Sequence, residues 1–303
     1  MRIFRSFEDA CGIRNPVVTT GSFDGVHIGH KTILNRLKML AAKYDGESVL
    51  ITFDPHPRKV LYPDTAGKDL KLINSGEEKI LLLEKAGLDN VIIVNFTVNF
   101  SHITSEEFVS RFLIGILHAR AIVVGFNHHF GFNKEGDYRQ LWSWREKYGF
   151  EAEEIPEQEV YHESVSSTRI RQALKEGYIQ KANAYLDHYY ILKGACSECS
   201  FPGEAAPGGM YRVEVGDESK LIPPYGIYAV SADSGTGCCK GMAIIMRQDG
   251  KQEIFLDLFG QKVNNTDVTL YFQKKIHGAL NLSDSSWHSR VKFARDEIAD
   301  LIY

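Results

Sequence analysis

The chain is organised around residues 17–30, which read VVTTGSFDGVHIGH. The first four are apolar or β-branched, a composition that favours a buried strand. The backbone can then turn and approach a ligand closely, because glycines follow at Gly21, Gly25 and Gly29. Apolar residues recur at helical spacing after this point. The segment is therefore predicted to run from strand through loop into a helix that begins near His30.

The start of this helix is predicted to bind an anion. A helix N-terminus presents free N–H groups and the positive end of the helix dipole. His27 and His30 lie at that point, and an imidazole can donate a hydrogen bond to a phosphate oxygen. The alternative is an ordinary turn between a strand and a helix, with solvated histidines. We favour the phosphate of a nucleotide as the ligand.

Three further motifs follow in order along the chain. They read TFDPHPR at 52–58, VGFNHHFG at 124–131 with Gly136 and Asp137 close behind, and SSTRIR at 166–171. His-x-Gly-His after a strand is the signature of the nucleotidyltransferase superfamily, which includes the class I aminoacyl-tRNA synthetases. The four motifs together closely resemble the adenylyltransferase module of prokaryotic bifunctional riboflavin kinase/FAD synthetases. Adenylyl transfer is therefore the first functional hypothesis.

The composition predicts two soluble domains. A chain of 303 residues exceeds the usual size of one domain, and its 44% hydrophobic and 24% charged content is ordinary for a globular protein. A net charge of −4 gives no sign of the basic surface that nucleic acid requires, and a Lys-Met-Ser-Lys-Ser counterpart is missing. Both observations argue against a tRNA-binding synthetase. No apolar run reaches about 18 residues, so we expect a cytoplasmic protein without a membrane partner.

Cysteines and adjacent histidines raise the question of a metal site. A four-thiolate zinc site is conceivable from Cys196, Cys199, Cys238 and Cys239. Neighbouring cysteines cannot easily point at one metal, so reduced thiols are expected instead. His128 and His129 also diverge as neighbours, and no carboxylate stands at ligand spacing. The metal ligands therefore stay unassigned.

Strand and helix patterns alternate through the first part of the chain. Strands are predicted at 48–53, 91–94 and 120–125, and a helix at 77–88. Thr104 and Glu107 form a capping box at the start of another helix. This alternation indicates an α/β fold with a Rossmann-like, doubly wound parallel sheet. The motifs fall on strand ends or helix starts, the edge at which such sheets bind ligands.

The SSTRIR motif is predicted to hold phosphates. Its serines and threonine can cap a helix, and Arg169 and Arg171 lie just inside that helix. Cations at a helix N-terminus oppose the dipole, so an anion between them would relieve both unfavourable interactions. This favours a clamp on the β- and γ-phosphates of ATP. A capped surface helix without a ligand is the alternative.

The pattern changes near residue 182. A helix is predicted to close over 183–190, and short strands follow at 211–215, 226–232, 240–246, 253–259 and 266–273. Closely spaced short strands indicate a small antiparallel barrel, which a helix over 287–302 is expected to close. We therefore expect a nucleotidyltransferase domain at 1–182 and a barrel domain at 183–303. This layout resembles the riboflavin kinase module of the same family.

The resemblance implies Mg-ATP and FMN as substrates, with riboflavin as a third candidate, and Mg²⁺ as the metal. It assigns catalysis to His27, His30 and Arg171. It assigns nucleotide binding to Gly21, Phe23, Asp24, Gly29, Ser166, Ser167 and Thr168. It assigns flavin binding to Pro55, His56, Asn127 and Phe130. The chain departs from the common family wording at His128, where an aromatic residue is usual, and at Lys134, where an arginine often stands.

The kinase motif departs further. The family builds its kinase site on Gly-Phe-Pro-Thr-Ala-Asn, whose Thr and Asn hold Mg-ATP, whereas residues 200–206 of this chain read SFPGEAA. Gly203 and Ala205 supply no side-chain oxygen, although Glu253 matches the family's catalytic glutamate. Three hypotheses follow: an FAD synthetase with a disabled kinase module, a fully bifunctional enzyme with a rebuilt kinase site, and a catalytically silent flavin- or nucleotide-binding regulator. The intact phosphate motifs favour the first over the third. The oligomeric state is left open.

Overall fold

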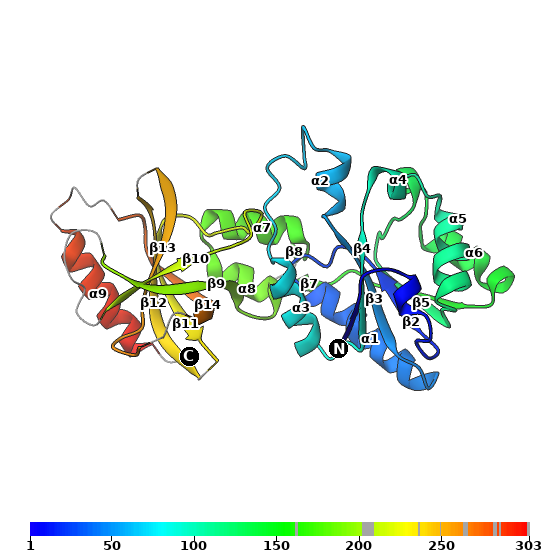
Figure 1. Ribbon diagram of the computed structural model, residues 1–303, viewed down its shortest axis with the longest axis horizontal. Coiled ribbons are helices and arrows are strands. Elements are labelled where there is room, and N and C mark those ends of the chain that lie inside the picture. The colour runs from blue at the N-terminus through cyan, green and yellow to red at the C-terminus, as the bar shows by residue number, and fades with distance from the viewer. Residues whose placement is uncertain are drawn as a thin grey trace. The chain divides into compact units, whose positions relative to one another are not determined.

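The structure is a computed structural model that divides the chain into two compact units (Figure 1). It describes residues 1–160, 163–201, 209–235, 237–248, 250–262, 266–280, 284 and 286–301. One unit comprises residues 1–70 and 79–166, and the other comprises residues 71–78 and 167–303. The boundary expected between residues 182 and 183 separates two functional domains, and its position stays a prediction.

The first unit is built on a six-stranded parallel sheet. Its strands lie in the order β1-β4-β3-β2-β5-β6, and every neighbouring pair is parallel. Their bounds are β1 (Arg2–Phe4), β2 (Val17–Thr20), β3 (Ser48–Asp54), β4 (Asn90–Asn95), β5 (Ala121–Gly125) and β6 (Glu151–Ile155). This confirms the doubly wound sheet. The chain steps outward from β2 through β3 to β4 and then resumes on the other side of β2 with β5. The loops after β2 and β5 therefore flank the point at which ligands bind in such sheets.

Helices cover both faces of this sheet. Successive residues of a strand point to opposite faces, so each strand offers apolar side chains to the helices on both sides. Val17, Leu50 and Val91 pack with apolar residues of α1 (Ile28–Lys43) and with Leu83 of α3 (Gly76–Lys85). Val18, Val49 and Ile92 pack on the other face. That face is covered by η1 (Glu8–Ala10), the π-helix η2 (Phe108–Ile116) and α6 (Tyr138–Tyr148). The helix predicted to begin near His30 begins at Ile28, with His27 as its N-cap.

Short elements connect these layers. They are α2 (Pro57–Leu61), α4 (Val98–Ser101), α5 (Ser105–Glu107), η3 (Phe132–Lys134) and the strand pair β7 (Glu159–Val160) and β8 (Glu163–Ser164). The Thr104 hydroxyl accepts a hydrogen bond from the Glu107 backbone N–H over 3.1 Å, so the predicted cap is present. Among the described residues, no helix combines the length and apolar character needed to cross a bilayer.

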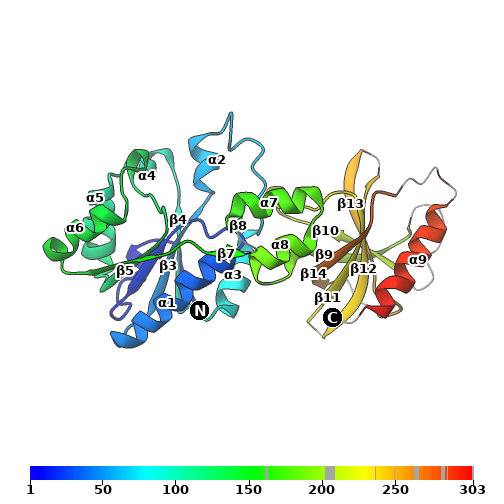
Figure 2. The ribbon, with the colours of Figure 1, turned by 180° about the vertical axis from the view of Figure 1, so that it is seen from behind.

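The second unit contains a closed antiparallel barrel of order β10-β13-β12-β11-β14-β9. Its strands are β9 (Tyr190–Cys199), β10 (Met210–Glu214), β11 (Gly226–Asp233), β12 (Cys238–Gln248), β13 (Lys251–Asp257) and β14 (Thr266–His277). The predicted barrel is therefore confirmed. Helix α9 (Trp287–Asp300) buries Trp287, Ala294 and Ile298 against it. Helices α7 (Ser167–Glu176) and α8 (Ile179–Leu186) lie side by side in both views (Figures 1 and 2).

The helix predicted over 183–190 is wrong in its second half. Helix α8 ends at Leu186, because Asp187 adopts the left-handed conformation (φ 57°) that terminates helices. Asn183 then accepts a hydrogen bond from the Tyr190 backbone N–H (2.7 Å) and donates one to the Phe272 carbonyl (2.8 Å). These contacts direct the chain into β9, which the sequence analysis did not predict.

A buried ion pair attaches residues 71–78 to the barrel unit. Lys220 and Glu78 are 0% and 1% exposed, and Lys220 Nζ lies 2.5 Å from Glu78 Oε2. The ammonium also donates to the carbonyls of Ile73 (2.5 Å) and Ile191 (2.7 Å). The Glu78 carboxylate accepts the backbone N–H of Lys193. Each charge is thus paired and hydrogen-bonded, which is the condition under which buried charges are tolerated.

Replacing one partner of this pair should be costly. Lys220→Met leaves the Glu78 carboxylate buried without its cation, so the free energy of unfolding of the second unit should fall by about 3–5 kcal/mol. Denaturant unfolding measures the loss when it is followed by Trp287 fluorescence in a background in which Trp142 and Trp144 of the first unit are replaced by Phe. Lys251→Met removes an exposed lysine of the same barrel and is the matched control. The double variant Lys220→Met/Glu78→Gln should recover part of the stability. A loss below about 1 kcal/mol for Lys220→Met would contradict this account of the pair.

Candidate functional site

The loop after β2 has an unusual backbone conformation. Phe23 (φ 47°) and Val26 (φ 42°) both lie in the left-handed region, which a β-branched residue such as Val26 occupies only at a cost in energy. Gly25, at φ 98°, can adopt its conformation because it lacks a Cβ. Strain of this kind persists only where surrounding contacts hold it, and it concentrates at ligand sites. The loop is therefore a candidate ligand cradle on structural grounds alone.

Three aromatic rings stack directly behind this loop. The His27 and His30 ring centroids lie 3.6 Å apart at an interplanar angle of 18°. The Phe23 ring continues the stack at 4.3 Å from His30. A Cβ on Gly29 would approach the His27 imidazole to 3.3 Å, so the small residue lets the ring lie close to the helix backbone. Residues 23, 27, 29 and 30 thus form one packed unit at the start of α1.

His30 is held neutral. Burial lowers the pKa of His30 well below 6.5, and the nearby His27 and Lys79 lower it further. Its Nδ1 atom is buried and has no hydrogen-bond partner among the described residues. A cationic ring would pay far more for such burial than a neutral one does. A neutral imidazole still has one N–H to donate to a phosphate oxygen.

Lys79 supports the loop after β2 through hydrogen bonds, and the sequence analysis did not identify this residue. Its ammonium donates to the Ser22 carbonyl over 3.0 Å and lies 3.4 Å from the Thr52 hydroxyl, which also donates to that carbonyl. Burial lowers the pKa of Lys79, and the carboxylates of Asp24 and Asp54 act in the opposite direction. The sequence contained one signal that could have identified Lys79, because position 79 lies four residues before the buried Leu83 and shares a helical face with it. A lysine on an apolar face indicates a specific partner.

Two adjoining cavities open at the carboxyl edge of the sheet. The cavity of about 540 Å³ is bordered by the stacked rings and by the loops after β2 and β5. Its wall contains the predicted residues Gly21, Phe23, His27, Gly29, His30, Asn127 and Ser166. We call it the imidazole cavity. It offers backbone, amide, hydroxyl and imidazole groups to a polar ligand.

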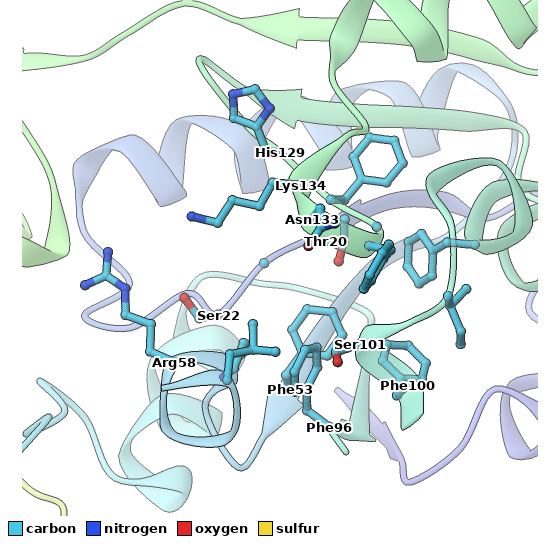
Figure 3. A pocket seen from close by; sticks show the side chains of 18 of the residues that line it. Thr20, Ser22, Phe53, Arg58, Phe96, Phe100, Ser101, His129, Asn133 and Lys134 are labelled. Carbon is cyan, nitrogen blue, oxygen red and sulfur yellow. The ribbon is translucent and has the colours of Figure 1, made fainter. Parts of the chain in front are cut away.

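The second cavity has a volume of about 700 Å³ and is strongly aromatic. Its wall contains His56 and Phe130, two of the residues predicted to bind flavin. Further aromatic side chains of the wall come from Phe53, Phe96, Phe100, Phe108 and Tyr62. We call it the aromatic cavity. In Figure 3 the rings of Phe53, Phe96 and Phe100 lie on one side, and the side chains of Arg58 and Lys134 lie on the other. A flat aromatic ligand with a charged end suits such a lining.

Some predicted residues do not border either cavity. Asp24 is buried, and its carboxylate acts to raise the pKa of Lys79 against the lowering by burial. Pro55, whose bond to Asp54 is cis, is absent from both walls. Ser167, Thr168 and Arg171 lie on α7, which belongs to the second compact unit, and Arg171 is buried there. The assigned roles of these residues stay predictions.

Among the described residues there is no cluster of three or more His, Cys, Asp or Glu side chains that could hold a metal ion. All five cysteines are free thiols, and Cys196 and Cys199 lie on β9.

The family model for FAD synthetase matches residues 12–169. The chain is 32% identical over 264 residues to a bifunctional riboflavin kinase/FMN adenylyltransferase of Listeria monocytogenes, covering 87% of this chain and 81% of the relative. A protein of that name from Bacillus subtilis is 29% identical, with coverage of 92% and 85%. A solved structure titled as a macrolide-efflux protein from Streptococcus pneumoniae superimposes with a TM-score of 0.84 over 99% of both chains. At 22% identity, it supports the fold alone.

The charge state of His30 can be tested directly. Because the folded-state pKa lies well below 6.5, the His30 imidazole should be mostly neutral at pH 6.5 in an NMR titration of the labelled ring. Lys79→Met removes a nearby cation and should raise this pKa, but not to 6.5, because burial is the larger cause. Lys85→Met, at the exposed end of the same helix, is the matched control and should leave it unchanged.

The same shift has a consequence for stability. The unfolded chain binds a proton at His30 more readily than the folded chain does. The contribution of the neutral His30 imidazole to the free energy of unfolding is therefore fully present above pH 6.5. It is lost as the pH falls toward the folded-state pKa.

In the NMR titration, a His30 midpoint at or above pH 6.5 in the wild-type protein would contradict the neutral imidazole.

Proposed function

The chain belongs to the FAD synthetase family, and from this we propose that its first unit transfers AMP from Mg-ATP to FMN, forming FAD and releasing pyrophosphate. The observation that carries the proposal is the pair of adjoining cavities, one polar and bordered by imidazoles, the other aromatic with a cationic side. ATP and FMN have matching chemistry: phosphates suit the first cavity, and a flavin ring suits the second. A single-substrate binding protein would not need both.

The chemical step needs no covalent enzyme intermediate. A phosphate oxygen of FMN attacks the α-phosphorus of ATP, a new P–O bond forms, and the bond from the α-phosphorus to the β-phosphate oxygen breaks. Pyrophosphate leaves with the electron pair of that bond. Such reactions are accelerated mainly by positioning and by stabilisation of the developing charge. No proton has to be removed from a phosphate oxygen that is already ionised.

In this mechanism His27 and His30 donate hydrogen bonds to the α-phosphate as its negative charge develops. The Phe23 ring and the α1 backbone hold both imidazoles in place, so little reorganisation is required at the moment of reaction. Asn127 contributes an amide to the same cavity. Ser166, Ser167, Thr168 and Arg171 are proposed to bind the leaving pyrophosphate.

The second unit is proposed to bind flavin without phosphorylating riboflavin at a comparable rate. The departure at Gly203 and Ala205 supports this, and both residues lie outside the described part of the chain. Glu253 on β13 is retained, but its carboxylate lies 3.3 Å from the Arg212 guanidinium. The relatives are named as bifunctional enzymes, which keeps the alternative of a working kinase open. A silent regulator is the third alternative.

The adenylyltransferase proposal predicts that wild-type protein converts FMN and Mg-ATP into FAD and pyrophosphate. His30→Ala should lower kcat by roughly 10²–10³-fold, as expected for one donor that acts in the transition state, with a much smaller effect on the KM for ATP. Chromatographic separation of the flavins gives the rate. If saturating substrates yield no FAD with the wild type, the regulator alternative replaces this proposal.

The kinase proposal predicts that riboflavin and Mg-ATP yield little FMN plus FAD under conditions in which added FMN is rapidly adenylylated, so the sum of the two products measures phosphorylation. The same chromatographic assay reports both reactions, so the wild-type adenylyl transfer serves as the internal control. Riboflavin phosphorylation at a comparable rate that disappears in Glu253→Gln would establish the bifunctional alternative, and Glu204 would then be the first candidate for a replacement magnesium ligand.

A further inference from the structure

The reaction restricts where the two reacting phosphates can lie. If the nucleotide occupies the imidazole cavity and the flavin ring the aromatic cavity, the FMN phosphate and the α-phosphate of ATP must meet where the cavities join. Only groups that border both cavities can then contact the attacking phosphate. The described residues that do so are Thr20, Gly21, Ser22, Arg58, His128 and His129.

Arg58 is the one permanent cation in this shared set. His128 does not compete for the role, because burial lowers its pKa to about 4 and leaves the ring neutral. A guanidinium presents several N–H donors in a planar fork, which can bind two oxygens of one phosphate at once. Its charge state does not change across the physiological pH range.

The surrounding charge also favours an anion at this position. The described lining of the aromatic cavity contains Arg58 and Lys134 but no Asp or Glu side chain, and the imidazole cavity is bordered by Arg58 and by one carboxylate, Glu157. In Figure 3 the ends of both side chains lie on the side of Ser22, away from the phenylalanine rings. A cavity with an aromatic end and a cationic end matches a flavin that carries a phosphate better than an uncharged flavin.

The backbone of Arg58 is well held although its side chain is exposed. It lies in the first turn of α2, directly after Pro57, and its backbone N–H donates to Nδ1 of the N-cap residue His56 over 3.1 Å. The Arg58 carbonyl accepts the Tyr62 backbone N–H over 3.0 Å. The fixed turn presents the guanidinium to the cavity, and this also gives His56 a defined structural role.

We propose that the Arg58 guanidinium binds the phosphate of FMN at the junction of the two cavities and thereby selects a phosphorylated flavin as the adenylyl acceptor. This inference rests on the proposed function. It adds a specificity-determining residue that the motif analysis did not assign. Arg58 acts on the acceptor phosphate, whereas His27 and His30 act on the α-phosphate of ATP.

The test compares two flavins at the adenylylation site of the full-length chain. Arg58→Gln should raise the KM for FMN about 10- to 100-fold, because charge-assisted hydrogen bonds to the phosphate are lost. The inhibition constant of lumiflavin, a flavin ring without a ribityl phosphate, against FMN should stay within about 2-fold. The KM for ATP should also stay nearly constant. Lys59→Gln, one residue further along α2 and bordering neither cavity, is the matched control.

Each other outcome overturns the inference. Equal increases in the KM for FMN and the lumiflavin constant would show that Arg58 only supports the cavity wall. A fall in kcat with unchanged KM for FMN would place Arg58 on the nucleotide instead. Unchanged values throughout would exclude any role. Absence of FAD with wild-type protein would refute the proposed function and this inference with it, whereas normal wild-type turnover with an unaltered flavin preference would refute only the inference.

Discussion

The site depends on how the chain leaves β2. Between the end of that strand and the first turn of α1, the backbone adopts left-handed conformations at Phe23 and Val26. The Ser22 carbonyl is held in this arrangement by the Lys79 ammonium and the Thr52 hydroxyl. Desolvating the Lys79 ammonium is costly, so its hydrogen bond and the nearby carboxylates of Asp24 and Asp54 have to offset that cost.

The division into two cavities follows from the sheet topology. The loops after β2 and β5 separate at the point where the strand order reverses, and the loop after β3 adds Arg58 at their boundary. One cavity thus collects imidazoles and backbone groups, and the other collects phenylalanine side chains. In a site of this kind polar groups fix orientation, while apolar surface supplies most of the affinity. The lowered pKa of His30 is consistent with the role proposed for it, because a desolvated neutral N–H donor acts strongly on a developing charge.

The second unit is stabilised by different means. Its barrel has no open sheet edge, and α9 adds a layer of apolar side chains over one end of its core. Residues 71–78 are tied to the barrel through the buried Lys220–Glu78 pair, although they precede it by more than a hundred positions in the chain. Loss of one partner from such a buried pair is strongly penalised, because the other charge then stays buried without its counter-ion.

The sequence by itself determined the strand–loop–helix unit at 17–43, the parallel α/β sheet, the small barrel and the two histidines, because these follow from local periodicity, glycine spacing and the order of four motifs. Only the tertiary structure showed the contacts of Lys79 and Lys220 and the position of Arg58 between the two cavities. Lys79 contacts a carbonyl 57 positions away, and Lys220 contacts a carboxylate 142 positions away. The edge strands β1 and β6 and the whole of strand β9 were also missed. Edge strands carry a weak apolar signal, and the start of β9 depends on the long-range contacts of Asn183. Such contacts arise from packing between distant segments, which no local pattern records.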